Sequence, residues 1–294
     1  MIRTLILAAC LFSLPLLPAG AADLDARIEP LLKAHKGTVA VAVKHLKTGE
    51  EFSRNADEPM PTASLIKLPI MVEAYWQAAE NKVKLDKPLT LRKEDKVPGS
   101  GILTSHFSDG ATFPLRDAVR LSIAFSDNTA TNLVLDEIGI PSTNLRMEKL
   151  GFKHTKINAK VYKGSTTSID PERTKKFGLG STTAREMVQL LERIEAGKVV
   201  SPEACKEMIA HLKSCDDREK MTRLLPAGTI VAHKTGSVNA SKTDAGILYL
   251  KSGPVALCVL TDKNDDVRWT PDNAGQVLIA KVAKEVYEHF GEKK

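Results

Sequence analysis

The first hydrophobic pattern along the chain is an alternation near its start. Within residues 37–44, valine alternates with alanine, which is the two-residue period of a β-strand. Thr48 and Gly49 then supply a turn, and residues 51–53 begin a return strand. These positions predict a β-hairpin, with a helix before it.

Strand patterns return near the other end of the chain. Residues 229–232, 245–250 and 254–260 are short apolar runs, and Gly253 lies in the turn before the last of them. Short apolar runs bounded by turn residues predict three strands. Residues 273–290 then have the apolar spacing of an amphipathic helix.

The middle of the chain has the pattern of helices. Apolar residues recur at helical spacing in three segments: Leu65, Leu68, Val72 and Trp76; Leu115, Val119 and Ile123; and Leu133, Val134 and Ile138. Strands at both ends with helices between them predict an α/β (α+β) fold, with an antiparallel sheet flanked by helices. One lobe would hold residues from about 23–60 and 200–294, and an all-helical lobe of about 61–199 would be inserted in it.

The first 22 residues (1–22) predict a signal peptide and not a part of the fold. Arg3 gives a positive start, residues 4–17 are apolar, and residues 19–21 read Ala-Gly-Ala, a cleavage site of the A-x-A kind. The apolar run is too short for a transmembrane helix. Lipoprotein cleavage at Cys10 is the less favoured alternative, because apolar sequence continues after it. We therefore expect an exported protein, periplasmic or secreted, without stable membrane insertion, whose catalytic domain is residues 23–294.

Composition and charge narrow the function classes. Hydrophobic residues make up 43% of the 294 residues, enough for a packed core, and the formal net charge is +6. The basic residues are scattered along the chain and are not grouped. The charge therefore favours solubility or attraction to an anionic cell envelope, and not nucleic-acid binding.

The cysteines suggest neither a disulfide nor a metal site. Cys205 and Cys215 are predicted near opposite ends of one helix, and ten residues of helix span roughly 15 Å, too far for a bridge. Cys258 lies in an apolar strand. The spacing does not match a zinc site, so we expect no disulfide, no metal and no cofactor.

Residues 64–67 form the one S-x-x-K sequence in the chain. Residues three apart on a helix share a face, so Lys67 can lie beside the Ser64 hydroxyl. A serine hydroxyl needs a neighbouring base to become a nucleophile, and burial can lower a lysine pKa enough for that task. By itself the motif is also compatible with a helix start and a solvated lysine.

Two further motifs follow. Residues 126–128 read Ser-Asp-Asn at a predicted helix start, where these residue types are also ordinary caps. Lys-Thr-Gly occurs twice, at 47–49, which we assign to the hairpin turn, and at 234–236, which continues a strand. There Gly236 would let a substrate lie close to the strand. His233 is expected to face away, because neighbours on a strand point to opposite faces.

Together the motifs are more specific than any one of them. In the order S-x-x-K, S-D-N and K-T-G they form a set typical of class A β-lactamases and penicillin-binding proteins, and the chain resembles a class A β-lactamase-like serine hydrolase. The similarity extends over most of the chain, including Pro-Ala-Gly at 226–228 and the helix start at 181–184. It implies the β-lactamase/transpeptidase-like fold and acyl transfer to Ser64.

The resemblance assigns the catalytic steps to four residues. Ser64 would attack the substrate carbonyl, and Lys67 would accept the hydroxyl proton. Ser126 would relay a proton to the leaving nitrogen, and Lys234 would supply the positive field that makes this transfer possible.

The same resemblance implies how a substrate would be held. Asn128 would bind the amide on the acyl side, and Thr235 together with Lys234 would bind the substrate carboxylate. The backbone N–H groups of Ser64 and Ser237 would form an oxyanion hole.

Two features of class A enzymes are missing. The Glu-x-x-Leu-Asn of the Ω-loop, whose glutamate activates the water that frees the acyl-enzyme, has no match in residues 160–180. Asp170 and Glu172 are the acids of that segment, and solvated surface acids are the favoured interpretation of both; either could replace the glutamate only in a rebuilt loop. The arginine that often follows K-T-G is also absent, and Asp244 and Ala245 occupy that region.

The expected function is a serine hydrolase that forms an acyl-enzyme at Ser64 with β-lactams, with β-lactamase activity that is weak if deacylation is slow. A D,D-peptidase or penicillin-binding protein acting on peptidoglycan peptides is the first alternative, favoured by the missing glutamate. A non-catalytic exported binder of cell-wall fragments or β-lactams is the second. The partner would be a small-molecule β-lactam or a peptidoglycan peptide, and the protein would be a monomer.

Overall fold

The computed structural model describes residues 19–291. The charged start and apolar run of the expected signal peptide, and Cys10 within it, lie outside the described residues. The helix expected before the hairpin is present and begins at Ala19.

The elements follow one another in the order α1 (Ala19–Ala34), β1 (Thr38–His45), β2 (Glu51–Arg54), β3 (Met60–Pro61), η1 (Ala63–Ile66), α2 (Lys67–Ala79), β4 (Pro88–Thr90), η2 (Lys93–Asp95), α3 (Leu103–His106), β5 (Thr112–Pro114), α4 (Leu115–Ala124) and α5 (Asn128–Ile138). They continue with α6 (Ile140–Lys149), β6 (Lys156–Ile157), α7 (Gly164–Thr167), α8 (Pro171–Phe177), β7 (Gly180–Thr182), α9 (Ala184–Glu195), α10 (Pro202–Lys213), β8 (Ile230–Val238), β9 (Ser241–Leu250), β10 (Gly253–Asp262) and α11 (Ala274–Gly291).

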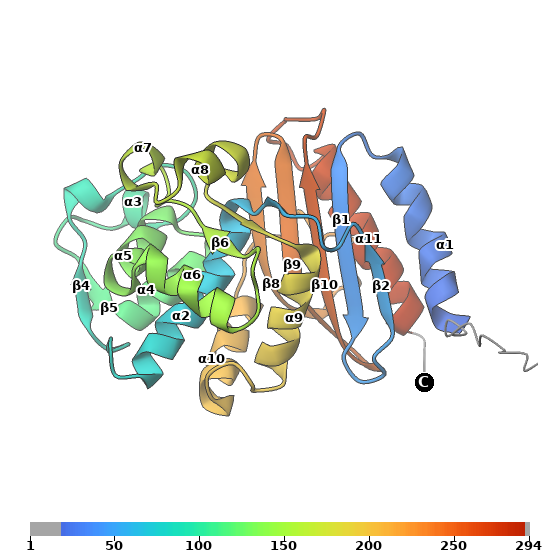
Figure 1. Cartoon of the computed structure of the whole chain (residues 1–294), viewed down its shortest axis with the longest axis horizontal. Coiled ribbons are helices and arrows are strands. Elements are labelled where there is room, and N and C mark those ends of the chain that lie inside the picture. Colours follow the sequence, from blue (N-terminus) through green and yellow to red (C-terminus); the bar gives the residue numbers. More distant parts are fainter. Residues whose placement is uncertain (1–18, 292–294) are drawn as a thin grey trace, which may run out of the picture.

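The main sheet has five strands in the order β2-β1-β10-β9-β8. Each neighbouring pair is antiparallel, and β1 from the start of the chain pairs with β10 from its end, Val41 opposite Val259. Figure 1 shows these two strands side by side, with the helical part of the chain beyond β8. The mixed α/β fold with an antiparallel sheet, flanking helices and an inserted helical region is confirmed.

The two faces of the sheet carry different residues. On β1 the valines belong to the core under α1 and α11, whereas Ala40 and Ala42 belong to the larger core shared with the central helices. Helices α1 and α11 contact each other, and α9 packs against β1 and β10 on the opposite face. Successive side chains of a strand point to opposite faces, which is why the alternation of Val and Ala predicted this strand.

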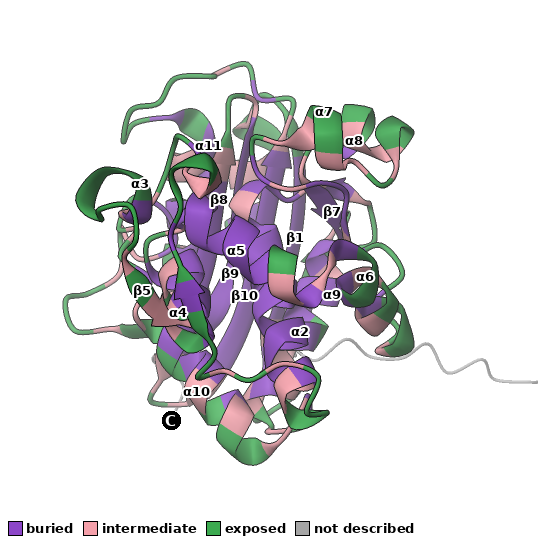
Figure 2. Cartoon of the chain, turned by 90° about the vertical axis from the view of Figure 1, so that its left-hand side faces the viewer, coloured by how far each residue is buried: buried purple, intermediate pink, exposed green. Residues whose placement is uncertain are grey.

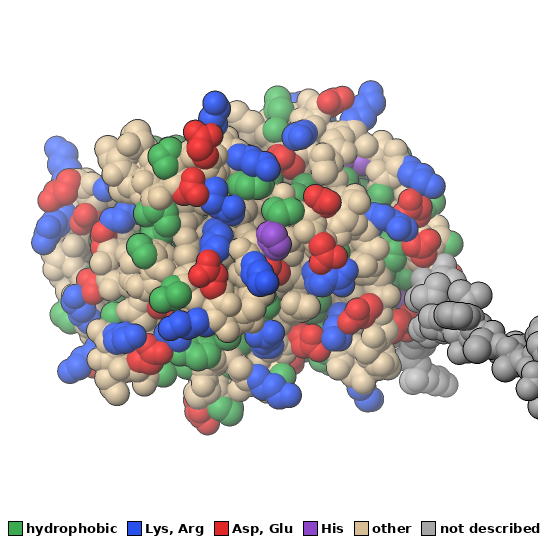
Figure 3. Space-filling model, viewed as in Figure 1, with side chains coloured by type: hydrophobic (Ala, Val, Ile, Leu, Met, Phe, Trp, Pro, Cys, Tyr) green, Lys and Arg blue, Asp and Glu red, His purple; other side chains and the backbone are tan. Residues whose placement is uncertain are grey.

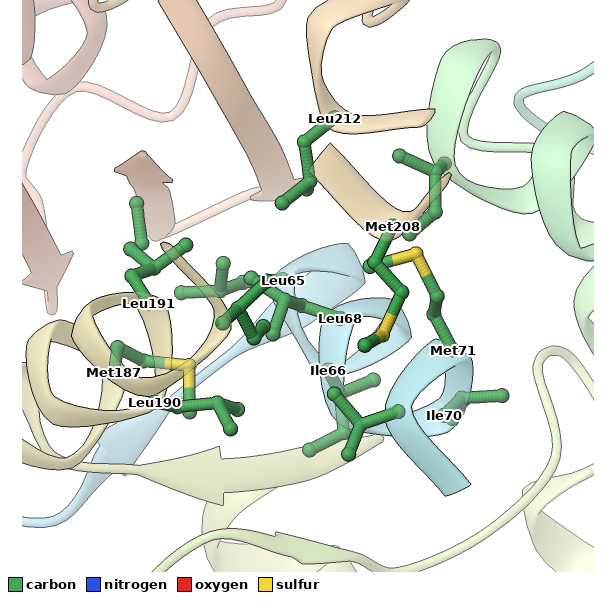
Figure 4. Close-up of a cluster of buried hydrophobic side chains, with 14 of the residues drawn as sticks. Leu65, Ile66, Leu68, Ile70, Met71, Met187, Leu190, Leu191, Met208 and Leu212 are labelled. Carbon is green, nitrogen blue, oxygen red and sulfur yellow. The ribbon is translucent and has the colours of Figure 1, made fainter. Parts of the chain in front are cut away.

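Helix α2 lies at the centre of the molecule. Most of its residues are buried, from Lys67 to Gln77, and in Figure 2 it is buried almost all the way round. Figure 4 shows its apolar side chains together with those of η1, α9 and α10, among them Leu65, Ile66, Leu68, Met71, Met187, Leu190, Met208 and Leu212. A helix that is apolar all round is held by packing on every side, so the residues at its start have fixed positions.

The middle of the chain is less purely helical than its pattern predicts. Strands β3, β7 and β6 form a small three-stranded sheet, and β4 pairs with β5. These strands have two or three residues each, too few to show a period of two. The helix expected to hold Cys205 and Cys215 also ends earlier than predicted, because α10 stops at Lys213 and leaves Cys215 in the following turn. Both thiols are buried and free, as is Cys258.

The surface carries charges of both signs. Figure 3 shows lysine and arginine side chains interspersed with aspartate and glutamate over the face it presents. No helix of the described chain is both long and apolar enough to cross a membrane.

Candidate active site

A cavity of about 1030 Å³ opens where the start of α2, strand β8 and the segment between β6 and β7 meet. It brings together Ser64, Ser126, Asn128, Thr235, Gly236 and Ser237 from three separate motifs. Lys67 and Lys234 are completely buried beneath it. The cavity thus unites residues that are far apart in the sequence, at a place where pockets commonly form between lobes.

Ser64 lies in the 3₁₀ turn η1 and not in the α-helix itself. The turn begins at Ala63, whose φ of 46° is left-handed and strained for a residue with a side chain. Two hydrogen bonds fix Thr62 just before it: its N–H donates to Gly180 O at 3.0 Å, and its carbonyl accepts from the Thr243 hydroxyl at 2.9 Å. The nucleophile candidate is therefore held by both the main sheet and the small one.

Lys67 begins α2 and is fully buried. Its Nζ lies 2.6 Å from Ser126 O, 2.8 Å from Asn128 Oδ1 and 3.3 Å from Ser126 Oγ. These partners are uncharged. Burial, together with the positive charge of Lys234, holds the pKa of Lys67 well below its usual value, against a smaller opposing effect of Asp127. The neutral amine, which can accept a proton, is therefore more accessible than in an exposed lysine.

Ser126 and Asn128 stand on either side of the α5 start. Ser126 has a left-handed φ of 51°, which turns its carbonyl toward Lys67. Asn128 accepts from Lys67 through Oδ1 and donates through Nδ2 to Pro98 O at 2.9 Å. Ser100 donates to Ser126 O at 2.7 Å and also lines the cavity. No motif pointed to Ser100, because it lies in a loop without periodic pattern.

Asp127 is structural, as its motif position allowed. Its carboxylate caps α5 by accepting from Ala130 N at 2.8 Å, and it also accepts from the N–H groups of Ile102 and Leu103. It therefore fixes the loop that carries Ser100 to the helix that carries Asn128.

The K-T-G strand is β8, whose residues face two sides. Lys234 donates to Thr235 O at 2.7 Å, and burial holds its pKa below the usual lysine value. Gly236 lines the cavity, and its close approach to a substrate stays a prediction. A Cβ at this position would lie 2.5 Å from Thr62 O and 2.8 Å from Ser64 N, so the missing side chain makes room for the turn that carries Ser64. Gly236 thus also permits a close contact within the protein.

His233 packs against Asp244 and Cys215 and does not face the cavity. Its Nδ1 lies 3.1 Å from Asp244 Oδ1, and all three side chains are buried. Burial alone would lower the pKa of His233, but the Asp244 carboxylate and the Cys215 thiol outweigh it and raise that pKa to about 10. Asp244 also accepts from Met221 N at 3.0 Å. The pair therefore fixes the turn after α10 to the sheet.

Lys220 and Asp217 reach the cavity from that turn. Lys220 is buried and its Nζ lies 2.7 Å from Asp217 Oδ2. Lys220 thus supplies a cation near Thr235, where the sequence lacks the arginine of class A enzymes. The sequence carries no signal for it, because neither residue belongs to a motif or to a periodic element.

The segment between β6 and β7 forms the outer wall. Asn158 N donates to Leu179 O at 2.9 Å and closes the segment at its base. Asn132 of α5 makes two hydrogen bonds of 2.9 Å with Val161: its Nδ2 donates to the carbonyl, and its Oδ1 accepts from the N–H. The next residue, Tyr162, has a left-handed φ of 56° and lines the cavity.

Neither acid of this segment reaches the cavity. Asp170 caps α8 by accepting from Arg173 N at 3.0 Å, and Glu172 is exposed on the same helix. Among the described residues that line the cavity, the carboxylates are Asp217 and Asp262, which come from the opposite wall. The described chain also has no group of three His, Cys, Asp or Glu residues that could hold a metal ion.

Known proteins are similar to this chain in both sequence and fold. The beta-lactamase enzyme family matches residues 23–290. The extended-spectrum beta-lactamase PER-1 of Pseudomonas aeruginosa is 25% identical over 90% of this chain and 86% of its own length. A beta-lactamase structure from Sphaerobacter thermophilus superposes with a TM-score of 0.79 at 28% identity, covering 92% of this chain and 97% of its own. The structure of PBP-A has the same TM-score and coverage at 25% identity, and a variant of PBP-A was solved as an acyl-enzyme complex with penicillin G.

Proposed function

Since the chain belongs to the beta-lactamase enzyme family and is a serine hydrolase of the class A β-lactamase type, we propose that Ser64 is the residue that its substrates acylate. The observation that carries this proposal is the environment of Lys67. A buried lysine with uncharged partners and a lowered pKa lies one turn from Ser64, which is the arrangement a serine nucleophile needs.

Acylation then follows from the donors and acceptors around Lys67. A neutral amine has two N–H groups and one lone pair. The N–H groups donate to Ser126 O and Asn128 Oδ1, the two shortest contacts. The lone pair is left to accept a hydroxyl proton, from Ser64 as it attacks the carbonyl of the substrate.

Other groups of the site would protonate the leaving nitrogen and stabilise the negative charge that develops on the carbonyl oxygen. Ser126 Oγ lies 3.3 Å from Lys67 Nζ, so a proton can pass from Lys67 through Ser126 to the leaving nitrogen. Lys234, buried beneath this path, would supply the positive field that assists this transfer. The N–H groups of Ser64 and Ser237 receive the oxyanion, and the position of Ser64 N against Gly236 supports this role.

The substrate is held by groups that line the same cavity. Asn128 has a second N–H on Nδ2 for an acyl-side amide, because Pro98 O takes only one. Thr235 and Lys234, with Lys220 nearby, form the positive end of the site. A β-lactam or a peptidoglycan peptide fits these groups. The protein would act on such compounds as an exported monomer.

Deacylation is the slow step in this proposal. The carboxylates of the cavity lie on the K-T-G wall, and Asp170 and Glu172 lie outside it. A water attacking the Ser64 ester would lack an oriented base, which is worth 10²–10⁴ in rate. The protein is therefore a β-lactam acylating enzyme with weak hydrolysis. The same observation favours the alternative of a D,D-peptidase or penicillin-binding protein, while the base beside Ser64 disfavours a non-catalytic binder.

Rapid kinetics with a chromogenic cephalosporin test the proposal. We expect a burst of colour near one equivalent of protein, then a slow steady phase, with the protein mass raised by one acyl group during that phase. A steady rate without a burst would show that deacylation is fast. Absence of both colour and adduct would refute acylation, and a non-catalytic binder would be the remaining alternative.

A further inference from the structure

The turn between α10 and β8 places a carboxylate inside the cavity. Asp217 lies in this turn, and 23% of its side chain is exposed toward the open space. Its neighbours on the cavity wall are Lys220 and Thr235. The family resemblance assigns the substrate carboxylate to Thr235 together with Lys234.

The Asp217 carboxylate already uses the donors of this wall. Its Oδ2 accepts from Lys220 Nζ at 2.7 Å and its Oδ1 accepts from Glu219 N at 2.9 Å, and the nearby Thr235 hydroxyl also favours the charged carboxylate. Burial alone would raise the pKa of Asp217, but Lys220 and these hydrogen bonds lower it to about 2. The carboxylate is therefore charged at every pH at which the protein would work.

The surrounding charges explain why an anion is needed here. Lys220, Lys234 and Lys242 are all buried, and the charge of Lys220 lowers the pKa of both other lysines after burial itself. Buried cations require a counter-charge. Asp217 supplies one within the chain, at the point where an anionic substrate would otherwise supply it.

We propose that the carboxylate of Asp217 occupies the anion subsite formed by Lys220 and Thr235, and that it selects against substrates with a carboxylate at this position. An incoming carboxylate must displace Asp217 from its donors or lie beside a like charge, which is costly in a desolvated site. A neutral ester or amide can accept from Thr235 without that cost. The preferred acylating compounds therefore carry an uncharged group here.

This inference rests on acylation at Ser64, and a matched pair of compounds tests it. The probes are a chromogenic cephalosporin and the methyl ester of its ring carboxylate. For each, the second-order rate constant of acylation is measured with the unchanged protein, with Asp217→Asn and with Asp216→Asn. Asp216 is exposed in the same turn, so its variant changes the net charge equally without altering the cavity.

We expect the acid-to-ester ratio of rate constants to rise roughly tenfold or more in Asp217→Asn, because a like charge is removed from the subsite. The ratio in Asp216→Asn should stay near that of the unchanged protein. Asp217→Ser, which keeps a hydroxyl and removes the charge, should repeat the rise if the asparagine variant folds poorly.

The outcomes separate this inference from the proposed function. If both compounds acylate the protein and the ratio is unchanged or falls in both Asp217 variants, Asp217 orients Lys220 toward substrate carboxylates and the inference is wrong. If the ratio rises equally in Asp216→Asn, the effect is long-range charge and the inference is again wrong. If neither compound acylates the unchanged protein, the proposed function fails and the inference fails with it.

Discussion

Lys67 defines the site at the scale of single residues. Its hydrogen-bond acceptors are a carbonyl, an amide oxygen and a hydroxyl, so no carboxylate in contact with it stabilises the ammonium form. Burial and Lys234 lower its pKa. A general base works only when it is deprotonated, so the same lowered pKa that makes Lys67 costly to charge makes it useful.

Replacing Lys67 by alanine should slow acylation of Ser64 by at least about 10²-fold, the loss typical of a missing general base. In the unchanged protein the acylation rate should fall only at a pH well below the ordinary lysine pKa, because the lowered pKa keeps Lys67 neutral down to that point. Stopped-flow acylation across pH measures both. Lys47→Ala, in the exposed turn that repeats K-T-G, is the control and should match the unchanged protein. An acid limb near pH 10 would assign the base role to another group.

Asp244 is the residue whose removal should cost most in stability among the buried ion pairs around the cavity. Asp244→Asn leaves the His233 imidazolium without its main counter-charge, which should lower the free energy of unfolding by about 3–5 kcal/mol. The raised pKa of His233 sets the pH range over which its ion pair with Asp244 stabilises the fold. The stabilisation is complete below the unfolded-state value near 6.5 and is lost as pH rises through about 10.

The free energy of unfolding is measured with urea at pH 6 and at pH 10. The difference in this free energy between Asp244→Asn and the unchanged protein should be large at pH 6 and small at pH 10. Asp86→Asn, an exposed site, controls for the general loss of one charge. A difference that does not change with pH would show that the hydrogen bond to Met221, and not the ion pair, carries the effect.

At the scale of elements, the site depends on how closely η1 lies against β8. Gly236 permits that contact, since Thr62 O, Ser64 N and the Thr243 hydroxyl all surround the face where a side chain would stand. The segment between β6 and β7 forms the other side of the cavity, where two hydrogen bonds between Asn132 and Val161 hold it against α5. Both contacts hold the Ser64 turn and the outer wall at fixed distances from α5.

Gly236→Ala should therefore impair catalysis more than stability. The new Cβ would lie 2.5 Å from Thr62 O and 2.8 Å from Ser64 N, so the Ser64 turn must shift, and a displacement of about 1 Å can cost roughly 10² in rate. Overpacking of this kind costs about 1–3 kcal/mol. Acylation kinetics and thermal unfolding of Gly236→Ala and of Gly291→Ala, which has room for a Cβ, measure the two effects. Normal acylation in Gly236→Ala would contradict the tight contact.

Sequence patterns predicted those elements of the whole molecule that have enough residues to show a period. The alternation in β1 and the apolar runs of β8, β9 and β10 located the sheet, and the spacing of α2, α4 and α5 located the central helices. The strands of two or three residues, such as β3 and β6, have no such signal. Their pairing depends on contacts between distant segments.

The three candidate motifs were visible in the sequence because each is a short local pattern. Ser100, Lys220 and Asp217 were missed because they lie in turns, and only the folded chain brings them to the cavity. The contact of Gly236 with the turn at Thr62 was missed for the same reason, since that turn lies far away in the sequence. Local chemistry is thus readable from sequence, whereas the shape and charge of the cavity arise from tertiary contacts.

The central claim for the molecule is that one serine, held between the sheet and the helical region, takes the acyl group. Incubation with penicillin G followed by peptide mass mapping tests it most directly, in the unchanged protein and in Ser64→Ala. We predict one added penicilloyl group, confined to the peptide that contains Ser64, and no label in the variant, whose thermal unfolding should remain cooperative. Labelling of Ser64→Ala, or of a peptide without Ser64, would contradict the account.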